Sequence, residues 1–209
     1  EGPALLDSTR ERLVRAVTEQ ARGRVPVLVG VFDAGTRRTI ELARRLVRLG
    51  GDAIVLVAPY YFAHTQAEIA AHLSAVARSL DVPSVIYNIP SAVKALIEPD
   101  TVAQLACMPE IIAIKDSLGD MARFQMLLRI RNSHAQFGVF QGAESVAALS
   151  IARGANGAVL GLANVAPRLC CDLYAAAHAG HLARAWTLQE QLMSLWRLHT
   201  HGQCLPCLK

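Results

Sequence analysis

The sequence alternates between short apolar runs and longer amphipathic segments, and successive runs start roughly 20 to 30 residues apart. Apolar residues are nearly continuous within each run, which is typical of parallel strands that are covered on both faces. The spacing leaves room for a crossover helix after each strand, so the pattern predicts a series of β-α units. The six predicted strands are 25–31, 53–58, 82–87, 111–115, 136–140 and 157–160.

Helix start and stop signals lie between these runs. The spacing of a capping box, in which side chains satisfy the first N–H groups of a helix, occurs at Ser8–Glu11 and at Thr65–Glu68. We expect Gly50-Gly51 to close a helix that begins near Thr36. Pro99 should open another helix, because its first turn needs no N–H donor there. After the last run only helices are predicted, over 167–179 and 181–199.

Six β-α units in a row fit either an open doubly wound sheet or a (β/α)8 TIM barrel. A dinucleotide-binding sheet should carry G-x-G-x-x-G after its first strand, and the segment Gly30-Val-Phe-Asp-Ala-Gly35 does not match it. The sequence therefore predicts an α/β TIM barrel formed by a single domain over 1–209. A complete barrel typically has about 250 residues, and this sequence starts just before a predicted helix, so we expect the opening strands of the barrel to lie outside it.

Composition excludes several other classes of protein. With 53% hydrophobic and 18% charged residues, the chain can bury one sizeable core and lacks the composition of a disordered protein. No run approaches the roughly 18 to 20 apolar residues of a membrane span, and residues 1–12 lack the pattern of a signal peptide. The five cysteines form no even framework, and Cys204 and Cys207 are interpreted as incidental thiols. We therefore expect a reduced, cytoplasmic setting.

The net charge of +4 comes almost wholly from arginine, because the only lysines are Lys94, Lys115 and Lys209. The arginines are scattered over the helical segments and interleaved with glutamates. A nucleic-acid-binding surface would instead need clustered charge with stacking aromatic side chains. The charge pattern thus indicates solvated helix faces and no nucleic-acid partner.

Lys115 is the sharpest chemical feature, since it ends an otherwise apolar predicted strand. Lysine, unlike arginine, can lose its proton, and burial in a barrel wall favours the neutral amine. A neutral amine can attack a ketone and form a Schiff base that acts as an electron sink. The alternative is a structural lysine that extends to solvent or pairs with Asp116.

Tyr87 ends the preceding predicted strand. On a barrel both side chains would lie at the C-terminal rim, where catalytic residues of this fold collect. A phenol there can pass protons to and from the carbinolamine and the aldol oxygen. The alternative is a buried tyrosine that hydrogen-bonds to the backbone.

Glycines follow the last two predicted strands. Gly142 permits close backbone approach to a ligand, and Gly161-Leu-Ala-Asn164 follows the final strand. In many barrels these two loops bind phosphate, so a phosphate-binding isomerase is an alternative. The region lacks a glycine cluster that opens directly into a short helix, which weakens this interpretation.

Several motifs occur together in one order. They are Pro59-Tyr-Tyr61, Tyr87-Asn-Ile-Pro90, Ile114-Lys-Asp-Ser117 with Gly119-Asp120, Gly154-Ala-Asn-Gly157 and Ala163-Asn-Val-Ala-Pro167. In order and spacing, over essentially the whole chain, they resemble the dihydrodipicolinate synthase and N-acetylneuraminate lyase family.

The resemblance implies a pyruvate-dependent class I aldolase or lyase on a (β/α)8 barrel, working without a metal or organic cofactor. It assigns Lys115 as the Schiff-base lysine and Tyr87 as the proton relay, with Gly142 and Val159 lining the pyruvate site. It also matches Tyr61 to a tyrosine that reaches into the site of a neighbouring subunit. The implied assembly is a homo-oligomer, usually a tetramer.

Two departures from the family pattern bear on activity and substrate. The family's Gly-Thr-Thr-Gly-Glu motif is represented only by its final residue, which would be Glu1. The resemblance also implies that the first two strands and the C-terminal helices of the barrel lie outside this sequence. Ala92 stands where the true synthases place an arginine for the carboxylate of the second substrate. Lys94 could hold a carboxylate instead, although a solvated loop lysine is the simpler interpretation.

These departures set the order of the functional hypotheses. The first is an aldolase for a 2-keto-3-deoxy sugar acid or a 4-hydroxy-2-oxoglutarate, which yields pyruvate and an aldehyde. The alternatives are 4-hydroxy-tetrahydrodipicolinate synthase, which condenses pyruvate with aspartate semialdehyde, and an inactive truncated relative.

Overall fold

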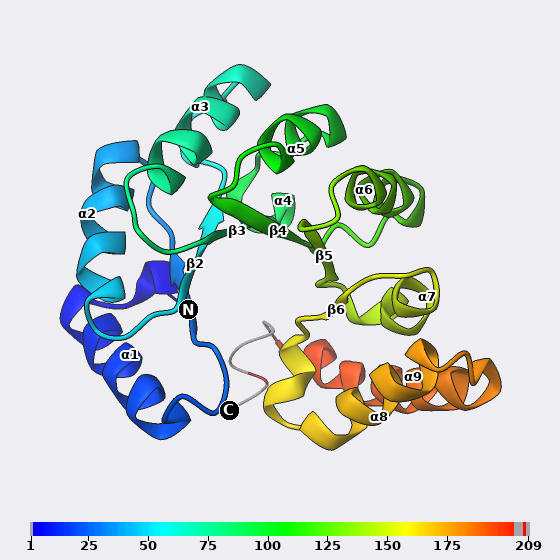
Figure 1. Ribbon diagram of the computed structural model, residues 1–209. Helices are drawn as coiled ribbons and strands as arrows, with labels where there is room; N and C mark the ends of the chain where they lie inside the picture. The colour runs from blue at the N-terminus through cyan, green and yellow to red at the C-terminus, as the bar shows by residue number, and fades with distance from the viewer. Residues whose placement is uncertain (1, 203–206, 208–209) are drawn as a thin grey trace. The chain divides into compact units, whose positions relative to one another are not determined.

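A computed structural model describes residues 2–202 and 207 of the chain. Glu1 and Cys204, which the sequence interpretation used, lie outside the described residues. Six strands form along the chain where apolar runs were predicted (Figure 1), with shorter bounds in most cases. They are β1 (Leu28–Val31), β2 (Ala53–Val57), β3 (Ser84–Asn88), β4 (Ile111–Asp116), β5 (Gly138–Gln141) and β6 (Gly157–Ala158).

The strand order in the sheet follows the chain order from β1 to β6. β2 pairs with β1 and with β3 in parallel, and β5 pairs with β6 in parallel. A doubly wound sheet reverses its strand order at a switch point, whereas a (β/α) barrel adds each strand beside the previous one. The topology is therefore that of a TIM-barrel-like α/β fold, as the sequence predicts.

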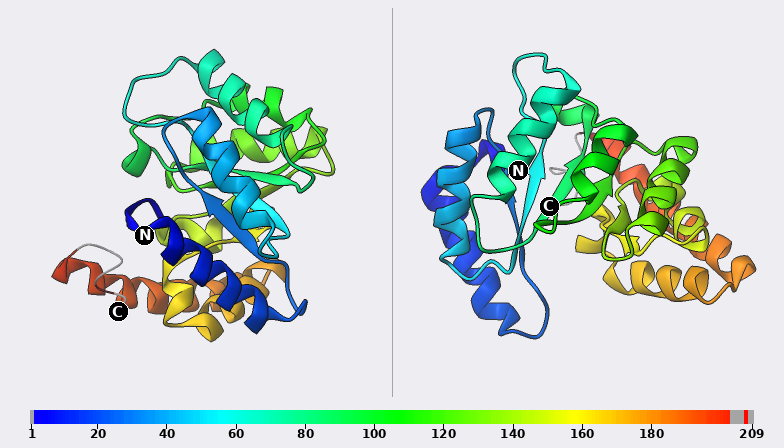
Figure 2. Two further views of the ribbon diagram at one scale, coloured as in Figure 1. Left: turned by 90° about the vertical axis from the view of Figure 1, so that its left-hand side faces the viewer. Right: turned by 45° about the horizontal axis from the view of Figure 1, so that its top comes forward.

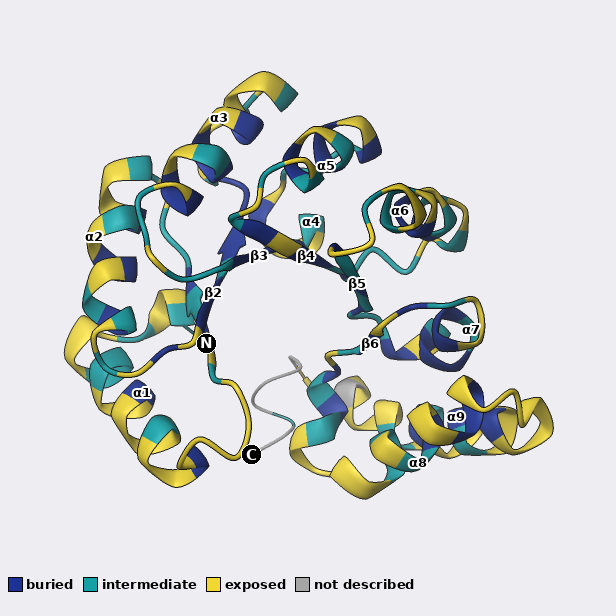
Figure 3. Cartoon of the chain, in the orientation of Figure 1, coloured by how far each residue is buried: buried dark blue, intermediate teal, exposed yellow. Residues whose placement is uncertain are grey.

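Helices alternate with the strands, and each is buried along one side and exposed along the other (Figure 3). This one-sided burial explains the amphipathic pattern of the sequence between the apolar runs. The helices are α1 (Asp7–Ala21), α2 (Thr36–Val47), α3 (Gln66–Ala77), α4 (Pro90–Val93), α5 (Pro99–Ala106), α6 (Met121–Ser133), α7 (Ala147–Ala152), α8 (Pro167–His178) and α9 (Leu182–Trp196), with short 3-10 turns η1 (Gly2–Ala4), η2 (Glu144–Val146), η3 (Gly161–Asn164) and η4 (Arg197–His201).

The chain divides into two compact units, one ending at Ile114 and the other starting at Lys115, so the boundary falls within β4. In the first unit α1 and α2 lie side by side (Figure 2), and Arg45 of α2 pairs with Asp7 and Glu11 of α1. In the second unit α7, α8 and α9 enclose an apolar core that includes Leu162, Leu173 and Leu192. A single domain over 1–209 stays a prediction.

Local signals were interpreted correctly at some helix ends and wrongly at others. Thr65 and Glu68 form the predicted capping box at the start of α3, and Pro99 is at the first turn of α5. The capping box predicted at Ser8 is wrong, because α1 begins one residue earlier and its N-cap, Leu6, makes no side-chain cap. α2 ends at Val47, three residues before Gly50, which takes a positive φ of 102° in the turn that follows. Among the described residues no helix is long and apolar enough to cross a membrane.

Candidate active site

Lys115 is the penultimate residue of β4, and its side chain is half-buried. Most of β4 is buried, including Ala113 and Ile114, whereas Ile112 is 39% exposed. Asp116, the last residue of the strand, is buried, and its carboxylate accepts a hydrogen bond from the N–H of Leu118 at 3.3 Å. The lysine Lys115 therefore lies near the carboxyl end of β4, next to the turn that follows the strand.

Gly142, directly after β5, lies against this lysine. A β-carbon placed on Gly142 would be 2.8 Å from Cε of Lys115, 2.0 Å from Oγ of Ser117 and 3.1 Å from the carbonyl oxygen of Asp116. The N–H of Gly142 donates to that same carbonyl at 2.7 Å, which fixes the approach. Only glycine leaves space beside the end of the lysine. The structure therefore brings together Gly142 and Lys115, two residues that the resemblance assigns to the site.

Val159 follows β6, which ends at Ala158 and is shorter than predicted. The N–H of Val159 donates to the main-chain oxygen of Gln141 at 2.8 Å, and the residue is 49% exposed. The same Gln141, fully buried at the end of β5, accepts the N–H groups of Gly142 and Ala143 with its side chain. Gln141 therefore joins the two positions that the resemblance assigns to pyruvate, and sequence reasoning missed it.

The N–H donors of the glycine loops are already occupied. The buried carboxylate of Glu144 accepts from the N–H of Gly161 at 2.7 Å and from that of Leu162 at 3.3 Å, at the start of η3. An anion at this turn would compete with a fixed negative charge. The structure therefore disfavours the phosphate-binding alternative.

One further buried side chain, that of Gln189, belongs to this region of the second unit. Gln189 of α9 donates to the main-chain oxygen of Glu144 and accepts from the N–H of Ala148. These bonds tie the loop after β5 to α9. Buried glutamine and glutamate are uncommon, but nothing in their sequence positions reveals these partners.

Tyr87, in the first unit, is the penultimate residue of β3 rather than its end, and it is half-buried. Its ring centroid lies 6.4 Å from that of Phe32, with the two planes inclined by 55°. The next residue, Asn88, is buried and accepts the N–H of Ile97 at 3.1 Å, which holds the chain after α4. The structure therefore fixes the backbone of the Tyr-Asn-x-Pro motif.

Tyr61 lies after β2 in a backbone conformation that is rare for a residue other than glycine, with φ at +88°. Its side chain is 87% exposed, and its ring packs edge-on against that of the exposed Phe62, with centroids 4.9 Å apart. The preceding Tyr60 is half-buried, and burial raises the pKa of its phenol. The segment thus exposes two aromatic side chains, Tyr61 and Phe62, and partly buries the third.

His72 of α3 is a buried titratable group that sequence reasoning did not select. Its Nδ1 lies 2.8 Å from Oγ1 of Thr36, at the start of α2. Burial, with a smaller contribution from the charge of His64, lowers the pKa of His72 to about 4. The imidazole is therefore neutral at pH 7.

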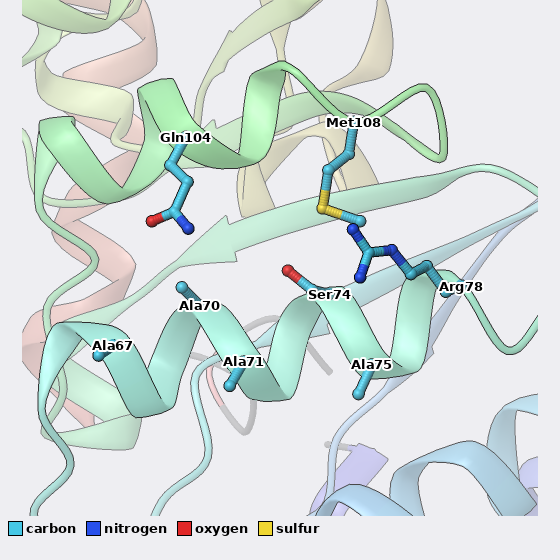
Figure 4. A pocket seen from close by; sticks show the side chains of 8 residues that line it. All are labelled: Ala67, Ala70, Ala71, Ser74, Ala75, Arg78, Gln104 and Met108. Carbon is cyan, nitrogen blue, oxygen red and sulfur yellow. The ribbon is translucent and has the colours of Figure 1, made fainter.

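A shallow hollow lies between α3 and α5 in the first unit, and Figure 4 shows its small alanine and serine side chains beneath the longer Gln104, Met108 and Arg78. None of the predicted site residues lines it. Within the described part of the chain, no group of three or more His, Cys, Asp or Glu side chains could hold a metal ion.

A family model described as "Dihydrodipicolinate synthetase family" matches residues 1–207. The chain belongs to this family. The sequence-based resemblance is thereby confirmed, and so, at the level of the family, is the reaction class of a class I aldolase or carbon–carbon lyase.

Individual members of the dihydrodipicolinate synthetase family cover most of the chain. The 4-hydroxy-tetrahydrodipicolinate synthase of Polynucleobacter asymbioticus is 35% identical over 97% of this chain and 71% of its own length. That of Stenotrophomonas maltophilia is 39% identical over 89% of this chain and 63% of its own length. The crystal structure of the Acinetobacter baumannii dihydrodipicolinate synthase complexed with pyruvate is 30% identical, with a TM-score of 0.91 over 97% of this chain and 69% of that one. The chain thus spans about two thirds of the length of these relatives.

Proposed function

We propose that the protein containing this chain forms a Schiff base between Lys115 and pyruvate and uses it to make or break a carbon–carbon bond. The observation that carries the proposal is the space left by Gly142 beside Cε of Lys115. Membership of the dihydrodipicolinate synthetase family supports it, and the similar Acinetobacter structure contains pyruvate.

In this mechanism the neutral amine of Lys115 attacks the keto carbon of pyruvate, and water leaves as the imine forms. Loss of a proton from the methyl group gives an enamine, whose carbon attacks an aldehyde. Hydrolysis of the product imine returns the lysine, and the reverse sequence cleaves a 2-oxo acid to pyruvate and an aldehyde. We assign Tyr87 the transfer of protons to and from the carbinolamine and the aldol oxygen.

Two observations bear on the identity of the second substrate, and they favour different compounds. The similar relatives are named 4-hydroxy-tetrahydrodipicolinate synthase, which favours aspartate semialdehyde over the sugar-acid aldolase reaction placed first from the sequence. Ala92 lies in α4, in the segment after the Tyr-Asn-x-Pro motif, and offers no charge to a second carboxylate. We therefore propose the synthase reaction first and cleavage of a 4-hydroxy-2-oxo acid as the second candidate.

Reduction with borohydride tests the Schiff base. The complete protein, incubated with pyruvate and borohydride, should gain one reduced pyruvyl group at Lys115, detected by peptide mass spectrometry. Lys115→Ala should abolish the modification. Lys94→Ala is the matched control, because Lys94 is exposed and donates to the carbonyl of Ser91 rather than lying beside Gly142. An unmodified Lys115 without turnover would contradict the mechanism and favour an inactive relative. Turnover retained in Lys115→Ala would contradict the mechanism alone.

The choice of aldehyde is tested separately, with the same protein and pyruvate. Turnover with aspartate semialdehyde supports the synthase, whereas pyruvate release from 4-hydroxy-2-oxoglutarate or a 2-keto-3-deoxy sugar acid supports the aldolase. We further propose that the protein is cytoplasmic, needs no added metal or organic cofactor, and assembles as a homo-oligomer, usually a tetramer, through Tyr61.

A further inference from the structure

The side chain of Gln141 is completely buried, and both ends of its amide form hydrogen bonds. Its oxygen accepts the N–H groups of Gly142 at 2.9 Å and Ala143 at 2.8 Å. Its nitrogen donates to Oγ of Ser150 at 2.8 Å, and Ser150 is also fully buried, in α7. An uncharged amide can make this set of bonds, because its oxygen accepts twice and its nitrogen donates.

The main chain of Gln141 adds a second connection. Its carbonyl oxygen accepts the N–H of Val159 at 2.8 Å, just after β6. One residue therefore fixes the turn after β5 and the end of β6 relative to each other and anchors both to α7. Gly142 is in turn bonded to the carbonyl of Asp116, the residue after Lys115.

The position of this turn determines the space beside the lysine. The gap between Gly142 and Cε of Lys115 is so small that one added carbon would overlap. A shift of the turn by a fraction of an ångström would therefore close or widen the place that a keto acid must occupy. Reaction rates depend steeply on such shifts, since misplacing the reacting groups by about 1 Å can lower the rate about 100-fold.

We propose that Gln141 is the positioning residue for the keto-acid end of this site, and that it sets the distance between Gly142 and Lys115 through its amide. The inference rests on the proposed Schiff-base function. Gln141 does not touch the amine itself; it acts through Gly142 and Val159.

The test compares the rate and the extent of borohydride trapping in the complete protein. Gln141→Leu removes the side-chain acceptor of the Ala143 N–H and one of the two acceptors of the Gly142 N–H, which keeps the carbonyl of Asp116. In this variant the rate constant of trapping at saturating pyruvate should fall about 10-fold or more. The final fraction of folded protein that is modified at Lys115 should equal that of the parent. A variant that is merely less stable would trap at the parental rate with a smaller extent, so the two readouts separate positioning from loss of fold.

A matched control exists in α3, where the side chain of Gln66 also accepts two hydrogen bonds, from Glu98 and Thr101, and donates one, to Leu96. Gln66→Leu should lower the urea midpoint and leave the trapping rate unchanged. Ser150→Ala is a milder change, which removes the partner of the Gln141 nitrogen together with the bond from the Ser150 hydroxyl to the sulfur of Met121. It should slow trapping by about 3-fold. This variant keeps the test decisive if Gln141→Leu does not fold.

The outcomes are distinct. A parent protein that traps no pyruvate overturns the proposed function and, with it, the role of Gln141. A parent that traps pyruvate, with parental rates in Gln141→Leu or, if that variant is unfolded, in Ser150→Ala, overturns the positioning role alone. Slower trapping at full extent, absent from Gln66→Leu, supports it.

Discussion

Gly142 carries a hydrogen atom where every other amino acid has a β-carbon. A β-carbon at this position would come too close to three atoms of residues 115–117. The carbonyl of Asp116 cannot move without breaking β4, so the added carbon of Gly142→Ala must displace the turn or the lysine. We expect Gly142→Ala to lower the free energy of unfolding by about 1 to 3 kcal/mol. Borohydride trapping of pyruvate at Lys115 should fall about 10-fold or more.

Gly35→Ala serves as the control for this change, because its added carbon would meet only Cδ of Arg38, at 3.9 Å. The backbone of Gly35 has φ at −123°, which any residue adopts. Its trapping rate should equal that of the parent. Equal rates in Gly142→Ala and in the parent would refute the close approach.

His72 gives the protein a pH-dependent stability. Its pKa of about 4 in the folded state is below the ordinary value of 6.5, so between these values the unfolded chain binds a proton that the folded chain does not. The stabilisation is fully present above pH 6.5 and is lost as the pH falls toward 4. The difference amounts to about 3 kcal/mol between pH 7.5 and pH 4.

Urea unfolding at several pH values measures this effect. In His72→Gln, which can keep a hydrogen bond to Thr36 without titrating, the pH dependence between 7.5 and 4 should be smaller by that amount. His181→Gln, at an exposed histidine, should follow the parental curve. Parallel curves for the parent and His72→Gln would show that His72 is not the group responsible.

At the scale of elements, the spacing of a capping box occurs at the starts of α1 and α3, but the capping box forms only at α3. At α3 the hydroxyl of Thr65 accepts from the N–H of Glu68 at 3.3 Å, and the Glu68 carboxylate accepts from the N–H of Thr65 at 2.8 Å. These bonds also lower the pKa of Glu68. We expect Thr65→Ala to destabilise the protein by about 1 kcal/mol.

Ser8 has the same spacing to Glu11 but lies inside α1. Ser8→Ala should therefore change the free energy of unfolding, measured in urea, by less than about 0.5 kcal/mol. Thr65→Ser should retain most of the stability of the parent. If Ser8→Ala were as costly as Thr65→Ala, the start of α1 would differ from the one described.

At the scale of the whole molecule, the exposed Tyr61 and Phe62 indicate a surface for assembly. Large exposed aromatic side chains are frequent hot spots in interfaces, where truncation costs about 2 kcal/mol or more. We expect the complete protein to sediment as a homo-oligomer, and Tyr61→Ala to raise its dissociation constant about 30-fold.

Tyr61→Phe keeps the ring and should assemble like the parent in analytical ultracentrifugation. If that variant traps pyruvate but turns over more slowly, the hydroxyl itself serves the site. A parent that sediments as a monomer at all concentrations would contradict the assembly.

Much of the architecture follows from sequence, because hydrophobic periodicity is a local property. All six strands, the order of β-α units and the family motifs around Tyr87 and Lys115 are visible in the sequence. Errors occur at element ends. β6 stops before Val159, and α1 starts before Ser8, because ladder and cap hydrogen bonds compete there with little difference in energy.

By itself, the sequence determined which strands form, that a lysine stands near the end of β4, and that a glycine follows β5, since each depends on residue type and local order. Tertiary structure alone decided which buried polar groups meet in the second unit. Glu144 and Gln189 bond to partners 17 to 45 residues away along the chain, and Gln141 bonds through its main chain to Val159. No periodicity encodes such pairings, because a buried polar group is placed by whichever donors and acceptors the packed helices and strands leave unsatisfied.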